Sequence, residues 1–198
     1  FLRVYLCQSE GDPVLAYNNL EFTIGGNGAI DCYKKTDGSW IVAIQGGNLG
    51  NWTNPFTAAT YKLTVDGTTA NMELANNLDF GAGRGSILLF DGDDMPDIFQ
   101  NGWVANADWT DQANLYLNDG DDWFMLQDES GIVKASNLFT TKADIDGDGK
   151  MDLAFATQGT EGAAYVYMNN GDGTFKEIEV AKYDQEAVGG VIHAEDDN

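Results

Sequence analysis

Four aspartates are spaced so that their carboxylates could share one metal ion. They occupy positions 1, 3, 5 and 9 of a loop in the segment ADIDGDGKMDLAFAT: Asp144, Asp146, Asp148 and Asp152. Gly147 and Gly149 allow the backbone to curl so that alternate side chains point inward. Carboxylates this close would repel one another unless a cation lay among them. A hard cation such as Ca²⁺ takes six to eight oxygen ligands, so the spacing predicts a calcium loop, with the backbone carbonyl of Lys150 at position 7 as a further ligand.

The residues after the loop distinguish it from an EF-hand. An EF-hand needs a bidentate Glu at position 12 and a helix on each side, but position 12 is Phe155. The loop leads instead into a short apolar run, 151–157. A second run, 164–168, is aromatic and β-branched and ends at the turn sequence Asn-Asn-Gly-Asp-Gly. The loop is therefore expected to lead into a β-strand.

The composition indicates an acidic globular chain. It has 198 residues, of which 43% are hydrophobic and 12% aromatic, which is enough for a buried core. The formal net charge of −22 argues against nucleic acid or an anionic membrane as a partner and favours cations. The single histidine, His193, gives little support for zinc or a Ser-His-Asp triad. No segment reaches the roughly 18 consecutive apolar residues of a membrane span, so direct membrane insertion is not expected.

The two cysteines, Cys7 and Cys32, each lie in an apolar, strand-like context. Because the chain is not a small disulfide scaffold, two buried free thiols are favoured, and a bridge between them is the alternative.

The calcium loop belongs to a sequence repeat. Residues 146–155 align with 91–100 at an offset of 55, and a weaker copy, 35–44, lies a further 56 residues back. The aspartates of the second copy that align with positions 146, 148 and 152 are Asp91, Asp93 and Asp97. Four tyrosines in β-rich runs are separated by 56, 55 and 51 residues: Tyr5, Tyr61, Tyr116 and Tyr167. Two landmarks with one period indicate a repeat architecture.

A period of this length with about four short strands is typical of β-propeller blades, since a twisted four-stranded sheet buries its faces only against its neighbours. The sequence predicts an all-β chain of about three and a half four-stranded antiparallel blades, an arc of a ring of about six to eight blades. The expected divisions of this single arc, residues 1–198, are a partial repeat at 1–20, a degenerate repeat at 21–77, a second repeat at 78–135, the best-preserved repeat at 136–184 and the start of a further repeat at 185–198. Both ends are thus expected to lie inside repeats of a longer chain or larger assembly.

The motif DIDGDGKMDLAF, followed about twenty residues on by YVYMNNGDGTF, resembles the FG-GAP or VCBS repeat family of integrin-α-like β-propellers. The similarity is strong for 137–180, good for 78–129 and weak for 18–67. In that family the aspartate-rich loop joins adjacent strands of a blade and holds calcium. The resemblance implies the same ligand set as the spacing: Asp144, Asp146, Asp148, the Lys150 carbonyl and Asp152.

The other two loops depart from this pattern. In the second copy Leu89 aligns with the first ligand position, so a weaker calcium site is expected there. Its ligands would be Asp91, Asp93, the backbone carbonyl of Met95 and Asp97. In the first copy Tyr33, Lys35 and Ile41 take the aligned positions, so this loop is expected to be free of metal.

Three of the five tryptophans lie in long connections between the first strand after the loop and the tyrosine strand: Trp52 in 46–57, and Trp103 and Trp109 in 100–112. Loops carry function more often than frameworks do, and aromatic faces flanked by amides and carboxylates suit sugar rings. Packing against neighbouring blades is the favoured interpretation of these tryptophans, and carbohydrate binding is the alternative.

Calcium without a neighbouring acid–base or nucleophilic apparatus is expected to be structural. No catalytic residue is predicted. The favoured function is a non-enzymatic, calcium-stabilised binding or adhesion module, extracellular or at a cell surface, that recognises glycan or protein through its loop faces. Two alternatives stay open: a propeller domain of a larger polysaccharide-active enzyme, and a structural component of a cell-surface assembly.

Overall fold

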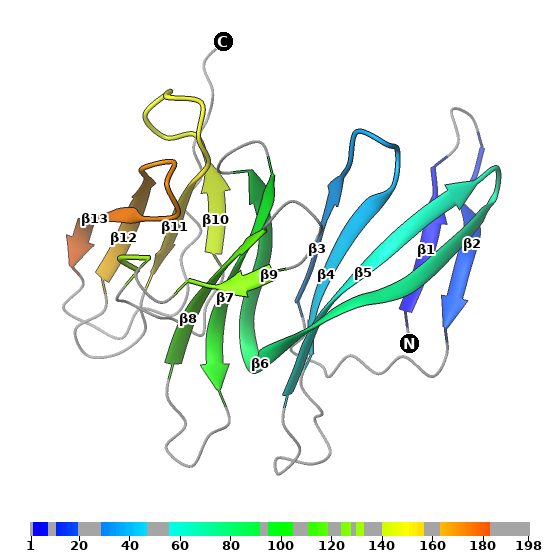
Figure 1. Ribbon diagram of the computed structural model, residues 1–198, viewed down its shortest axis with the longest axis horizontal. Coiled ribbons are helices and arrows are strands. Elements are labelled where there is room, and N and C mark those ends of the chain that lie inside the picture. The colour runs from blue at the N-terminus through cyan, green and yellow to red at the C-terminus, as the bar shows by residue number, and fades with distance from the viewer. Residues whose placement is uncertain are drawn as a thin grey trace.

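A computed structural model of the chain describes ten ranges: 2–7, 11–19, 29–46, 56–91, 95–104, 111–118, 124–127, 130–132, 140–156 and 163–182. Within these ranges the secondary structure consists of thirteen β-strands without a helix, which confirms the all-β prediction for the described part (Figure 1). None of the described residues forms a helix long and apolar enough to cross a membrane.

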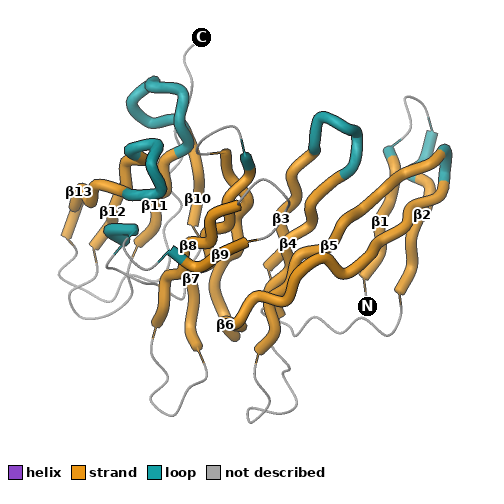
Figure 2. Tube along the Cα trace, viewed as in Figure 1, coloured by secondary structure: helices purple, strands orange, loops and turns teal. Residues whose placement is uncertain are grey.

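The strands follow one another along the chain as β1 (Leu2–Leu6), β2 (Val14–Asn19), β3 (Ala29–Lys34), β4 (Trp40–Gly46), β5 (Phe56–Asp66), β6 (Thr69–Asp91), β7 (Pro96–Val104), β8 (Asp111–Asn118), β9 (Phe124–Leu126), β10 (Thr140–Ala143), β11 (Asp152–Ala156), β12 (Ala163–Asn169) and β13 (Phe175–Lys182). Each strand within a sheet pairs antiparallel with the next strand in sequence, and the tube in Figure 2 shows these strands lying side by side.

Three successive groups of four strands form up-and-down units. The first unit, 29–81, contains β3, β4, β5 and the first part of β6, and the third unit, 140–182, contains β10 to β13. The second unit, 82–126, contains the last part of β6 and β7 to β9. Strand β6 is shared, because its residues 69–81 pair with β5 and its residues 82–91 pair with β7. One continuous strand therefore ends the first unit and begins the second.

The tyrosine landmark marks one strand position in these units. Tyr61, Tyr116 and Tyr167 lie in β5, β8 and β12, which are the third strands of the three units. Tyr5 lies in β1, which pairs with β2 in a separate hairpin. The hairpin thus corresponds to the third and fourth strands of a unit.

The apolar core lies between the units. One cluster joins the first and second units: Ile41, Ala43, Ala58, Leu78, Ile87, Leu89, Ile98, Tyr116 and Phe124. Another joins the second and third: Phe99, Leu115, Leu153, Phe155, Ala163, Tyr165, Tyr167 and Phe175. A third joins the first unit to the β1–β2 hairpin: Val42, Ile44, Leu63 and Ala70, with partly buried residues of the hairpin. Because successive residues of a strand point to opposite faces, the central strands of the first two units, β4, β5, β7 and β8, each contribute to two clusters.

The expected repeat divisions remain predictions. Residues 20–28, 133–139 and 183–198, where three of them fall, lie outside the described ranges. The division expected at 77/78 lies within β6, shortly before the pairing partner of that strand changes from β5 to β7 at 81/82.

The prediction that both cysteines are buried is wrong. Cys7 and Cys32 are free and exposed. Strand β3 alternates between partly buried and exposed residues, and Cys32 is on its exposed face together with Ile30 and Lys34.

Candidate metal centre

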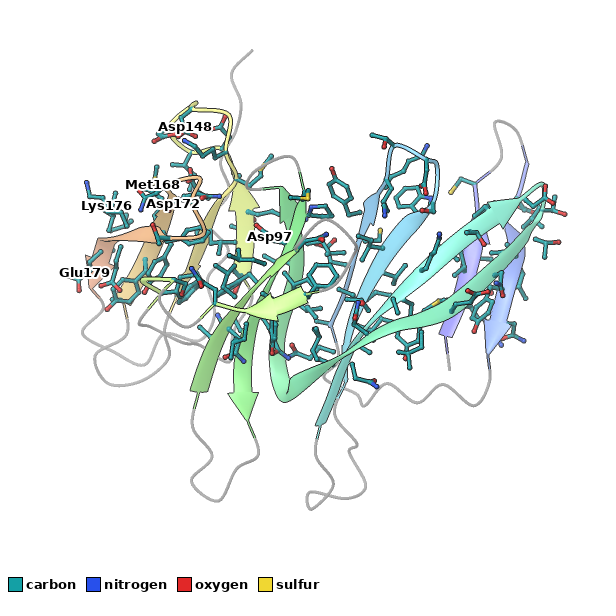
Figure 3. All side chains as sticks on the ribbon, in the orientation of Figure 1. Asp97, Asp148, Met168, Asp172, Lys176 and Glu179 are labelled. Carbon is teal, nitrogen blue, oxygen red and sulfur yellow. The ribbon has the colours of Figure 1, made fainter. Side chains whose placement is uncertain are left out.

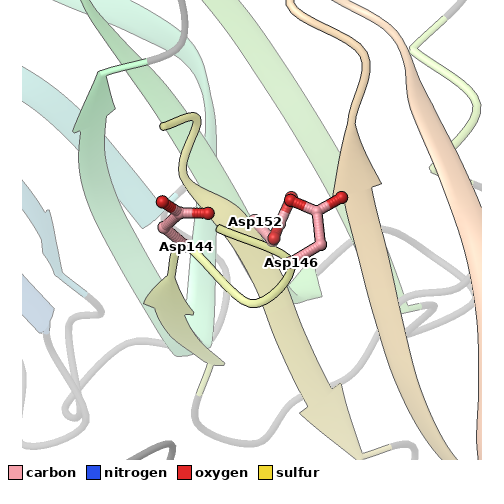
Figure 4. A group of neighbouring side chains, drawn as sticks. All are labelled: Asp144, Asp146 and Asp152. Atoms are coloured by element: carbon pink, nitrogen blue, oxygen red, sulfur yellow. The ribbon is translucent and has the colours of Figure 1, made fainter. Parts of the chain in front are cut away.

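The loop 144–151 joins β10 to β11, and its two ends are fixed by the last pair of the ladder, Ala143 with Asp152. Carboxylate oxygens of Asp144, Asp146 and Asp152 all lie within 4.8 Å of one another (Figure 4). Oxygens that share one Ca²⁺ at about 2.3–2.6 Å are at most about 5 Å apart. The three aspartates therefore fit a single hard cation, both in donor type and in spacing.

The loop holds its own curl through side-chain to backbone hydrogen bonds. Asp144 accepts the backbone N–H of Gly147 at 2.8 Å and of Gly149 at 3.0 Å, and Asp146 accepts that of Asp148 at 3.1 Å. The φ angles of Gly147 and Gly149 are +78° and +90°, which residues with a Cβ atom rarely adopt. The glycines therefore permit the curl, and the aspartates fix it.

Asp152 is the buried member of the group, with 1% of its surface exposed. Its two carboxylate oxygens accept the backbone N–H groups of Ile145 and Asn169, each at 2.8 Å. The side-chain amide of Asn169 in turn donates to the carbonyl of Met151 at 3.1 Å. Asp152 therefore ties the loop to the end of β12 in addition to facing the other two carboxylates.

Asp148 is not a member of this group of three, although its side chain also interacts with that of Asp146. It forms an ion pair with the Lys150 ammonium and accepts the Lys150 backbone N–H at 2.9 Å, and Figure 3 shows it at the tip of the loop. The hydrogen bond from the Lys150 side chain lowers the pKa of Asp148, and the same contact raises the pKa of Lys150. The roles of Asp148 and of the Lys150 carbonyl as ligands remain predictions.

The second loop repeats the buried aspartate. Asp97 is 5% exposed and accepts the backbone N–H of Asn118 at 2.9 Å, while the Asn118 side chain donates to the Pro96 carbonyl at 3.2 Å. Asp97 and Asn118 therefore have the same hydrogen-bond arrangement as Asp152 and Asn169 in the third unit.

The register of β6 and β7 corrects the alignment of this loop. Asp97 pairs with Phe90, as Asp152 pairs with Ala143, so Asp91 takes the place of Asp144. Leu89 is a buried strand residue paired with Ile98, and the interpretation that it replaces the first ligand is wrong. The second loop is two residues shorter than the third, which an ungapped alignment does not allow for.

The ligand set of the second loop remains a prediction. Asp93 and the side chain of Asp91 lie outside what the structure describes, and Met95 is partly buried. In the first loop the Asp37 carboxylate accepts the backbone N–H and the hydroxyl of Ser39 at 2.8 and 2.6 Å, and Ile41 is part of the core.

The tryptophan-bearing connections begin at the other edge of the sheets. Strand β7 carries Asp97 near its first residue and Trp103 near its last, paired with Asp111. At about 3.3 Å per residue these two positions are roughly 20 Å apart. The Trp103 side chain, Trp52 and Trp109 lie outside the described residues.

The sequence interpretation missed Asn118 and Asn169, although a signal was present. Each asparagine comes two residues after one of the repeating tyrosines, Tyr116 or Tyr167. In each unit its backbone N–H binds the buried aspartate, Asp97 or Asp152. In the first unit the corresponding residues are Leu63 and Ile41, so the polar pair is replaced by an apolar pair. The residue types at the two positions thus change together across the repeats.

The comparisons with known proteins identify the repeat that carries this centre. Residues 144–196 match the family model described as an FG-GAP-like repeat. Searches of curated proteins and of solved structures gave no significant match. The match covers the third loop, the rest of the third unit and the residues that follow it, which confirms the resemblance seen in the sequence: the chain contains an FG-GAP-like repeat.

Proposed function

We propose that the chain is a calcium-stabilised β-propeller arc that serves as a non-enzymatic binding module. The observation that carries this proposal is the convergence of Asp144, Asp146 and Asp152 within 4.8 Å at the start of an FG-GAP-like repeat. The oxygen donors and their spacing suit Ca²⁺, and the family supplies the precedent for calcium in this loop.

The role of the ion in this proposal is structural. Asp144 and Asp146 are exposed and Asp152 is buried, so a bound cation would offset the repulsion among three carboxylates that the fold brings together. Binding would also stabilise the folded chain over the unfolded chain, in which the three residues are not assembled. The chain's net charge of −22 makes a cation a favourable ligand in general.

The packing of the units supports the propeller arc. Each unit has four antiparallel strands, its apolar faces are buried against its neighbours, and β6 passes from one unit into the next. In this proposal the three units are blades, the β1–β2 hairpin is the outer half of a further blade, and the arc is part of a larger ring.

The partner in this proposal is a glycan or protein at a cell surface, and the medium is extracellular, where calcium is plentiful. Trp52, Trp103 and Trp109 are the candidate ligand-binding residues. Since β7 separates Asp97 from Trp103 along its length, the ion would support the scaffold rather than touch the ligand. Glycan-array binding that persists in both Trp52→Ala and Trp109→Ala would remove this part of the proposal.

Thermal unfolding in the presence of a chelator tests the calcium scaffold. We expect EGTA to lower the midpoint and Ca²⁺ to restore it, with Mg²⁺ at the same concentration ineffective, because Mg²⁺ requires a smaller and more regular oxygen cage. An unfolding midpoint that is the same with EGTA and with Ca²⁺ would count against the proposed function.

A further inference from the structure

A polar cluster joins all three units near the metal loops. It consists of Asp31 in β3, Leu89 in β6 and Lys142 in β10. The Asp31 carboxylate accepts the backbone N–H of Leu89 at 2.8 Å and contacts the Lys142 ammonium at 2.7 Å. The ammonium also donates to the Leu89 carbonyl. Asp31 and Lys142 therefore hold one peptide residue of the second unit from both sides, although they are 111 positions apart in sequence.

Lys142 belongs to the shortest strand of the third unit. Strand β10 has four residues and, within the described part of the chain, pairs only with β11. Two of its side chains, those of Thr140 and Lys142, contact other units. At its start the Thr140 hydroxyl accepts the buried side-chain amide of Asn101 at 3.1 Å, and near its end Lys142 contacts Asp31.

The residue that follows this strand is the first aspartate of the metal centre. Asp144 comes two positions after Lys142, and Asp152 pairs with the residue between them. Asp152 is bonded to Ile145, the residue after Asp144, and to Asn169 at the end of β12. Asp144 thus lies between two residues tied to Asp152, on a loop that starts from β10, so its place in the metal centre depends on the β10–β11 pair and on what holds β10.

We propose that Asp31 and Lys142 are positioning residues for the calcium loop: by anchoring β10 to the first and second units they hold Asp144 in reach of the ion. This inference rests on the proposed calcium function. It makes the metal centre of the third unit dependent on a carboxylate in the first.

Simple electrostatics predicts a different pattern. The Lys142 ammonium repels a cation and the Asp31 carboxylate attracts one, so charge alone would make Lys142→Met bind Ca²⁺ more tightly and Asp31→Asn less tightly. Positioning predicts that both substitutions weaken binding, because each breaks the same contact. The sign of the Lys142→Met effect therefore separates the two explanations.

Calcium titration calorimetry on the full chain tests the inference. The variants are Lys142→Met, Asp31→Asn and the double variant, with Lys176→Met as a control. Lys176 is an exposed lysine on β13 (Figure 3), so its substitution makes the same change in net charge away from the cluster. We expect about a fivefold or greater rise in the Kd for Ca²⁺ in each single variant, a typical size for coupling between sites. The Kd of the double variant should be no higher than that of the single variant with the higher Kd, because both substitutions break the same contact. The Kd of Lys176→Met should stay within about twofold of the wild-type value. Lys142→Arg retains the positive charge, so its Kd should also stay close to that of the wild type.

Circular dichroism in EGTA shows whether each variant is folded before it is titrated. If Lys142→Met does not fold, Lys142→Gln, which removes the same charge, decides the matter: positioning requires that it bind Ca²⁺ more weakly than the wild type, whereas charge alone requires that it bind more tightly. Folded variants that bind Ca²⁺ as tightly as the wild type, or a Lys142→Met that binds more tightly, would overturn the positioning role while leaving the proposed function intact. A wild-type chain that binds no Ca²⁺ would overturn the proposed function and this inference with it.

Discussion

The Oδ1 atom of Asp152 accepts the backbone N–H of Asn169 at 2.8 Å, and this contact closes the third unit at the same edge as the metal loop. The second unit repeats it with Asp97 and Asn118 at 2.9 Å. Both aspartates are buried. A buried carboxylate at this position therefore binds the backbone at the end of the third strand of its unit, whether or not it also binds a cation.

The first prediction concerns Asp152→Ala and Asp97→Ala measured in EGTA. Each substitution leaves a buried backbone N–H group, that of Asn169 or Asn118, without its acceptor, which costs about 1–3 kcal/mol. We expect urea denaturation to show losses of this size for both variants. Asp146→Ala is the matched control, because Asp146 is exposed and its described bond is to a neighbouring loop residue. A control that loses as much stability as Asp152→Ala in EGTA would refute the structural role of the buried aspartates.

The second prediction concerns the core between the second and third units. Phe155 is 1% exposed and stacks on Phe99 of the second unit and on Tyr167 of its own, with ring centroids 6.0 and 5.3 Å apart. We expect Phe155→Ala to lower the free energy of unfolding by about 3–5 kcal/mol. Ile178→Ala, at a residue that is 40% exposed on β13, should cost well under half of that. Equal losses in the two variants would mean that the units do not pack through Phe155.

The third prediction concerns pH. The hydrogen bond from the Ser39 hydroxyl lowers the pKa of Asp37, and the bond from the Ser39 backbone adds to this. A carboxyl whose pKa is lower in the folded chain stabilises it above the unfolded pKa of about 3.9 and loses that contribution as the pH falls through the folded pKa. We expect NMR titration to give a higher Asp37 pKa in Ser39→Ala than in wild type. No change would show that Ser39 does not hold this carboxylate in solution.

Much of the fold was predictable from the repeat. The tyrosines mark the third strand of each unit, and the aspartate loop joins two strands as the resemblance implies. The continuity of β6 was not predictable, because its residues 81–85, Gly-Ala-Gly-Arg-Gly, resemble the approach to a loop. In the fold Gly81 pairs with β5 and the following residues pair with β7, so the strand continues through the glycines.

The candidate site was predictable in part. The alternating aspartates predicted four carboxylate ligands, and the structure brings three of these carboxylates together. Asp148 differs because the lysine two residues on competes for it, a local contact that spacing alone does not reveal. The contact of Asp31 with Lys142 depends on how the units stack, and no local pattern encodes a pair so distant in sequence.

The fourth prediction concerns the central claim, that Asp144, Asp146 and Asp152 hold one calcium ion in the folded chain. The most direct test is to titrate wild type and Asp146→Asn with Ca²⁺ and to measure the binding by calorimetry and the stability by the midpoint of thermal unfolding. At a free Ca²⁺ concentration of about 100 times Kd, binding stabilises the wild type by about 2.7 kcal/mol, which for a chain of this size raises the midpoint by roughly 5–10 °C. We expect that rise in the wild type and its loss in Asp146→Asn, with Asp146→Asn at least as stable as the wild type in EGTA, because it has one carboxylate fewer in the group. The same calcium response in both proteins, or none in the wild type, would contradict the account.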